Sequence, residues 1–90
     1  MEKMFLKVKE IVDSFDYPGL LRIKFELFWN DKWGYYEIVP TFVMDYWRIS
    51  HSERKNQEML LNVLKHSLSD RIESYLGIHV ISPNASLVMN

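Results

Sequence analysis

The fold depends most on residues 20–48, LLRIKFELFWNDKWGYYEIVPTFVMDYWR, because apolar residues recur there at every second position. A period of two is typical of β-strands, whose side chains point alternately to opposite faces. Residues 20–29 and 35–48 are therefore predicted to be two strands. Their apolar faces carry Leu21, Ile23, Phe25, Leu27 and Trp29 in the first strand and Tyr36, Ile38, Phe42, Met44 and Tyr46 in the second.

Turn-forming residues at 30–34 separate the two strands and predict an antiparallel hairpin. The two apolar faces limit its register, since a slip of one residue would turn every side chain of a strand to the opposite face. A loop with an even number of residues, either 30–33 or 30–35, keeps both apolar faces together. We prefer the longer loop because it avoids placing Glu26 directly opposite Glu37, where like charges repel.

Helical periodicity precedes and follows the hairpin. Residues 2–15 have apolar side chains at helical spacing and predict a first helix. A turn at 16–19 leads from this helix into the first strand. Ser50 and Glu53 match a capping box, which predicts the start of one long helix. Gly77 is expected to end that helix as its C-terminal cap.

The resulting α-β-β-α-β order predicts an α+β fold with a three-stranded, mainly antiparallel sheet and two helices on one face. Residues 78–82 are predicted to be the third strand and 83–90 a weakly specified tail. We expect the third strand beside the first, which gives the order 2-1-3 and leaves the second strand at an edge. Pro40 suits an edge strand, because it cannot donate to a neighbour. A bulge at Gly34 or near Pro40 would change the register.

Composition indicates a single domain, 1–90, with more hydrophobic bulk than it can bury. Hydrophobic residues make up 48% of the chain, and Ala85 is the only small one among them. A domain of this size leaves a large share of its surface exposed. The net charge of -1 gives no basic footprint for duplex DNA. No targeting or membrane-spanning run is visible, so we expect a soluble, cytoplasmic protein.

No pattern predicts a catalytic, cofactor or metal site. The absence of cysteine excludes disulfides, thiol nucleophiles and cysteine-bound metals. Of the histidines, only His66 has an acidic residue one helical turn away, Asp70, and such pairs are usually solvated. The glycines do not cluster as in a phosphate-binding loop. We therefore predict a non-catalytic protein without cofactor or metal.

The excess apolar residues on the outer sheet face predict protein binding. Tyr, Trp and Arg are enriched where proteins dock. The second strand is also expected to outrun the first beyond Asp45, which would leave an unpaired edge at 46–48. We predict a small protein–protein interaction module, homodimeric, that uses this face and edge, unless the tail folds over them. The predicted partner-binding residues are Phe28, Trp33, Tyr35, Val39, Val43, Trp47 and Arg48.

The alternative prediction is a binder of single-stranded nucleic acid or of a small molecule. Interleaved aromatic and basic residues on a sheet face can stack bases and hold phosphates. On the outer face, the residues that could act in this way are Arg22, Lys24, Phe28 and Tyr35. Glu26 and Glu37 on the same face, with the negative net charge, favour the protein-binding prediction.

Overall fold

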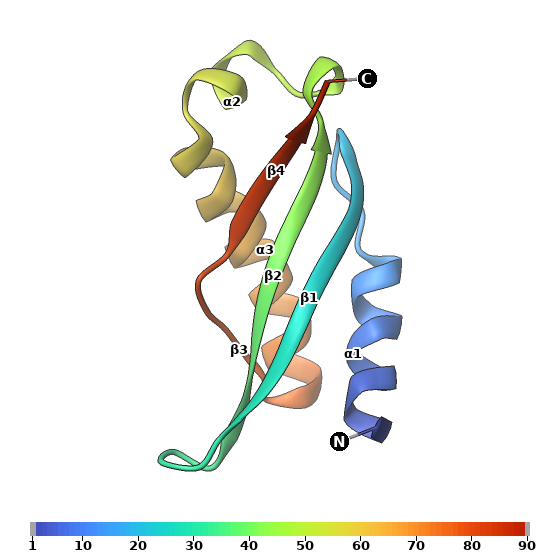
Figure 1. Cartoon of the computed structure of the whole chain (residues 1–90), viewed down its shortest axis with the longest axis vertical. Coiled ribbons are helices and arrows are strands. Elements are labelled where there is room, and N and C mark those ends of the chain that lie inside the picture. The colour runs from blue at the N-terminus through green and yellow to red at the C-terminus, as the bar shows by residue number, and fades with distance from the viewer. Residues whose placement is uncertain (1, 90) are drawn as a thin grey trace.

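The computed structural model describes residues 2–89, which form an α+β fold, as predicted. Within this range the strands are β1 (Leu20–Asn30), β2 (Tyr35–Asp45), β3 (His79–Val80) and β4 (Asn84–Val88), shown in Figure 1. The helices are α1 (Glu2–Ser14), the 3-10 turn η1 (Tyr46–Arg48), α2 (His51–Lys55) and α3 (Gln57–Leu76).

The strand order corrects the prediction, because β2 and not β1 is the central strand. β1 pairs antiparallel with one side of β2, and β3 and β4 pair parallel with its other side. The sheet is therefore mixed, and the order 2-1-3 is wrong. After the helical crossover that follows β2, the next strand, β3, pairs with β2. Consecutive strands of a β-α-β unit are usually neighbours in the sheet. The expected tail contains β4, which runs along Thr41–Asp45.

Pro40 occupies the central strand because the strand beside it is interrupted. The Ile38 carbonyl accepts from the Ile81 N–H at 2.9 Å, so Ile38 faces the side of β3 and β4. Pro40, two residues on, faces the same side and has no N–H to offer there. Between β3 and β4 the register shifts by one residue, Ser82 adopts a φ of 45°, and Pro83 also lacks an N–H. β3 and β4 are thus two halves of one strand.

The hairpin has the register of the longer predicted loop. Trp29 lies opposite Tyr36, and Glu26 lies opposite Val39 and not opposite Glu37. The ladder has its irregularity at the start of β1, where Leu21 is the extra residue, and not at either of the positions suggested by the sequence. The apolar faces of both strands therefore meet on one side of the sheet.

Helices α1 and α3 cover that side, and one continuous core joins them to the sheet. The predicted capping box at Ser50 and Glu53 is present. The single long helix is instead two, because Asn56 leaves the helical conformation and its side chain accepts from the Met59 N–H as a second N-cap. The most buried side chains are Val8, Ile38, Phe42, Met44, Leu60, Leu64, Leu68, Ile72 and Ile78.

Candidate functional site

The predicted partner-binding residues are spread over two ends of the molecule and do not form one surface. Phe28 and Trp33 are exposed near the hairpin turn, whereas Trp47 and Arg48 are exposed in η1 at the opposite end of β2. Tyr35 and Val39 are half-buried between them. Val43 is only 2% exposed and is unavailable to a partner. Its neighbours in the sheet are Arg22 on β1 and Ser86 on β4, so the C-terminal segment supplies part of its cover.

The predicted overhang of the second strand is absent. β2 ends at Asp45, which lies opposite Val88 of β4. The Asp45 carboxylate accepts from the Trp47 N–H at 3.0 Å and turns the chain into η1. Because β2 is central and its last residue is paired, residues 46–48 offer no strand edge.

The exposed Trp47 indole is held by Arg54 of α2. The Arg54 guanidinium lies 4.8 Å from the ring centre of Tyr46 and 5.8 Å from that of Trp47. It also donates to the carbonyls of Tyr46 and Ile49, at 2.8 and 3.1 Å. Cation–π contacts at exposed sites contribute about 0.5–1 kcal/mol. Trp47 is 59% exposed, so this end presents apolar surface to solvent.

A polar contact at the same end anchors the entry to β1. The Tyr17 hydroxyl donates to the Glu53 carboxylate at 3.0 Å, and the Ser50 N–H donates to the same carboxylate at 2.8 Å. Burial and the bonded, negatively charged Glu53 raise the pKa of Tyr17. Burial acts to raise the pKa of Glu53 as well, but hydrogen bonds from the Ser50 N–H, the Ser50 hydroxyl and Tyr17 outweigh it and lower that pKa. The contact joins the turn before β1 to α2.

The hairpin end carries aromatic residues that are not buried in the core. Trp29 packs edge-on against Tyr36 with ring centres 4.9 Å apart, yet it is 50% exposed. The sequence places Trp29 on the face covered by helices, but the hairpin turn reaches past α3, as Figure 1 shows. On the outer face the Tyr35 ring lies 4.1 Å from that of His79, which contacts Glu73 at 3.3 Å.

An apolar groove lies between α1 and β1. The Phe5 and Phe25 rings meet at 5.0 Å at its base. Its volume is about 580 Å³, and it is lined by Glu2, Phe5, Phe25, Glu26, Leu27 and Phe28. This groove is not predicted from the sequence, because the predicted strand order places β1 in the middle of the sheet. The exposed apolar positions of residues 2–15 are the signal that could have indicated it.

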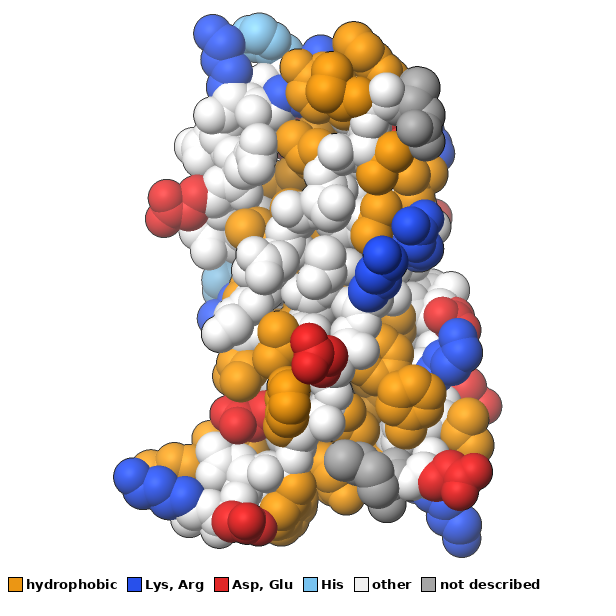
Figure 2. All heavy atoms as spheres, viewed as in Figure 1, with side chains coloured by type: hydrophobic (Ala, Val, Ile, Leu, Met, Phe, Trp, Pro, Cys, Tyr) orange, Lys and Arg blue, Asp and Glu red, His pale blue; other side chains and the backbone are white. Residues whose placement is uncertain are grey.

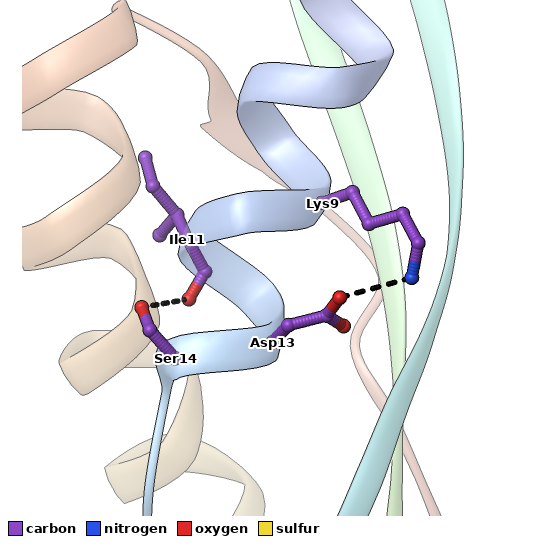
Figure 3. Close-up of polar contacts among 4 residues, drawn as sticks. All are labelled: Lys9, Ile11, Asp13 and Ser14. Carbon is purple, nitrogen blue, oxygen red and sulfur yellow. Dashed lines mark hydrogen bonds and ion pairs between the residues drawn. The ribbon is translucent and has the colours of Figure 1, made fainter.

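The two sides of α1 differ in what they face. Ser14 accepts from Arg71 of α3 at 3.3 Å and donates to the Ile11 carbonyl at 3.0 Å. The Lys9–Asp13 ion pair, 2.9 Å long, lies on the other side of the helix, toward the strands (Figure 3). A second hollow of about 300 Å³, lined in part by Asp13 and residues 20–23, lies separately at the start of β1.

The outer face beside the groove is basic at one end. Arg22 and Lys24 are exposed on β1, and no ion pair within residues 2–89 involves either of them. Figure 2 shows a pair of basic side chains above a gathering of hydrophobic ones on this side of the molecule. The groove lining thus combines apolar side chains with the acidic Glu2 and Glu26, and the exposed Arg22 and Lys24 lie further along β1 on the outer face.

The described residues offer no group of three or more His, Cys, Asp or Glu side chains placed to bind a metal ion. In the same range, no helix has both the length and the apolar character needed to cross a lipid bilayer. Comparison with known proteins gives no matching family model, no similar curated protein and no similar solved structure. The surface features of the chain itself are therefore what indicate its function.

Proposed function

We propose that this chain is a small, non-catalytic protein-interaction module that acts in the cytoplasm. The observation that carries the proposal is that large apolar side chains stay exposed although the core is complete. Several of them lie at the groove beside β1, at the hairpin turn and at η1. Exposed apolar surface of this kind often marks places where proteins bind. The most exposed side chains in these three places are Phe28, Trp29, Trp33, Trp47 and Met89, between 46% and 65%.

Self-association is the part of the proposal assigned to the η1 end. Trp47 and Met89 are 59% and 62% exposed. The pairing of Asp45 with Val88 brings the segments that carry them to the same end of the sheet, near the C-terminus in Figure 1. A rigid, exposed tryptophan is the kind of residue that contributes most to protein interfaces. Two copies are proposed to pack their η1 ends together.

Sedimentation velocity at micromolar concentration tests this proposal. The wild-type chain is expected to sediment as a dimer and the Trp47→Ser variant as a monomer. Trp33→Ser is the matched control, since it removes an equally exposed tryptophan at the hairpin turn and is expected to leave the dimer intact. A wild-type monomer whose mass Trp47→Ser does not change would overturn the homodimer.

Binding of single-stranded nucleic acid is the second candidate function. Its support is that Arg22 and Lys24 lie exposed on the same sheet face as Phe28. Phosphate contacts predict binding that weakens steeply with salt, and Lys24→Glu is expected to weaken it further. Fluorescence anisotropy with labelled oligonucleotides at low salt checks this. Absence of binding under those conditions would remove the nucleic-acid function and leave the protein-binding one standing.

A further inference from the structure

The outer side of β1 is an unpaired strand edge. Ile38 directs its backbone groups toward β3, and its partner in the ladder is Leu27. Opposite residues of an antiparallel pair direct their backbone groups either toward each other or both away, in alternation. Leu27 therefore directs its N–H and C=O groups away from β2. The same holds for the alternate residues Ile23, Phe25 and Trp29. Within residues 2–89 no strand other than β2 pairs with β1.

This edge is long and regular. From Ile23 to Trp29 it spans about 20 Å without proline or bulge. Proteins usually protect such edges, because their free N–H and C=O groups pair readily with another extended segment. The edge formed by β3 and β4 shows that protection, since it is broken between Val80 and Asn84. β1 has no comparable interruption after Leu21.

Helix α1 supplies an apolar floor beside the free edge. Phe5 packs against Phe25 yet remains 41% exposed. The groove lined by Phe5, Phe25 and Leu27 opens along β1. A further strand beside β1 would direct every second side chain toward this floor. Apolar side chains at those positions would bury the groove.

The other side chains of an added strand would lie on the outer face beside Arg22, Lys24 and Glu26. Opposite charges directly across two strands stabilise their pairing, and like charges oppose it. Arg22 and Lys24 have no ion-pair partner within the described residues. An antiparallel segment with acidic residues opposite these two, and a basic residue opposite Glu26, therefore matches the edge in charge.

We propose that the β1 edge binds an extended segment of another protein, which adds to the sheet as a strand antiparallel to β1. Its apolar side chains fill the groove over Phe5, and its acidic side chains lie beside Arg22 and Lys24. Strand addition is a common way in which proteins recognise peptides. This inference rests on the proposed role as an interaction module, and it names the chemistry of the partner.

A second copy of this chain is the competing occupant of the edge. Two β1 strands paired about a two-fold axis would carry both α1 helices on the same face of the joined sheet. Because α1 runs beside β1 (Figure 1), both helices would have to occupy the space at that junction. A single extended segment without a helix behind it avoids this conflict.

Two synthetic peptides test the proposal. TVKIEVE has the complementary charge order for antiparallel addition, and TVEIKVK has the same apolar residues with every charge reversed. Fluorescence anisotropy is expected to show about tenfold tighter binding of labelled TVKIEVE. Lys24→Glu is expected to remove most of this preference. Lys32→Glu, the same charge change in the exposed hairpin turn, is the matched control and is expected to retain it.

Amide hydrogen exchange measured by NMR identifies the binding mode. On adding TVKIEVE, exchange of the Ile23, Phe25 and Leu27 N–H groups is expected to slow, whereas the Lys24 and Glu26 N–H groups, already bonded to β2, change little. Equal affinity for both peptides, no binding at millimolar peptide, or binding without this alternation would overturn the proposal. Protection that appears without peptide and grows with protein concentration would assign the edge to a second copy. The sedimentation result at Trp47 is separate, so either proposal can fail alone.

Discussion

The two sides of β2 meet their neighbours in opposite ways. On one side β1 pairs antiparallel over its whole length, with a single irregularity at Leu21. On the other side β3 and β4 pair parallel in two short pieces, with Pro40 in the unpaired interval of β2 and Ser82 at a positive φ between the two pieces. One strand is thus continuous and the other is broken, although both contact the same central strand.

Because β1 is continuous, its outer edge can pair with another strand. Because β3 and β4 are interrupted, their outer edge is protected from such pairing. The outward groups of β1 form an unbroken row beside an apolar groove. The outer row of β3 and β4 is short and has a kink at its centre. Edge strands that are short, bulged or rich in proline resist pairing with other chains. The asymmetry therefore directs binding by strand addition to β1.

The largest effect is expected from Gly19→Ala, which changes the residue directly before the continuous strand β1. Gly19 has a φ of 86°, and a Cβ there would meet the Ile49 Cγ2 at 2.7 Å. The substitution is expected to lower the free energy of unfolding by about 2–3 kcal/mol. Urea denaturation measures the change. Gly34→Ala is the control, since it shares the positive φ but its Cβ would meet nothing within 4 Å. Equal losses in the two variants would show that close packing at Gly19 is unimportant.

A smaller effect is expected when Glu53 is replaced, because its carboxylate joins the turn before β1 to α2. Glu53→Ala removes the capping box and the acceptor of Tyr17, and should cost about 1–2 kcal/mol at neutral pH. The pKa of Glu53 is lowered in the folded state, so the stability it contributes is present above the ordinary carboxyl range and lost as pH falls. Thermal unfolding at several pH values should therefore show the two proteins converging in acid.

The contribution of Tyr17 to folding stability changes in the opposite direction, since it is lost at high pH. Its pKa is raised in the folded state, so its contribution is present below the ordinary tyrosine range and is lost as pH rises through the raised value. Tyr17→Phe is expected to be less stable than the wild type at neutral pH and to approach it in alkali. A constant difference across that range would show that the hydrogen bond to Glu53 does not govern the titration.

The smallest effect is expected on the broken side. Ser82 adopts a φ of 45°, a conformation that glycine tolerates better than serine. Ser82→Gly is expected to change the free energy of unfolding by about 0.5–1 kcal/mol in the stabilising direction. Calorimetry with Ser86→Gly as control, at a regular β4 position, checks it. Destabilisation by Ser82→Gly would mean that contacts of the Ser82 side chain stabilise the kink between β3 and β4, and that the positive φ of Ser82 does not strain the chain.

Local features of the fold were predictable from the sequence. Alternation identified both hairpin strands, and the repulsion between Glu26 and Glu37 selected the observed register. Ser50 and Glu53 marked a helix start. The break at Asn56 was missed because the leucine stripe continues through it. β4 was missed because it has only five residues, begins at a Pro-Asn turn signal, and is held by pairing with β2.

The candidate site was less predictable, because its two parts come from residues distant in the sequence. Phe5 of α1 and Phe25 of β1 line one groove only after the chain has folded. Val43 was expected on a binding surface and is instead buried, beside β4. Trp47 and Trp33 were correctly singled out as exposed aromatic residues, although they lie at different ends.

The sequence by itself determined the α+β class, the hairpin, its register and the face that the helices cover. These depend on side-chain alternation and on neighbours within a turn or a ladder, which are written directly in the order of residues. Only the tertiary structure decided which strand is central, and therefore which edge is free. That choice depends on where the crossover after α3 returns to the sheet, and it is made by long-range pairing of β2 with β3 and β4 rather than by any local pattern.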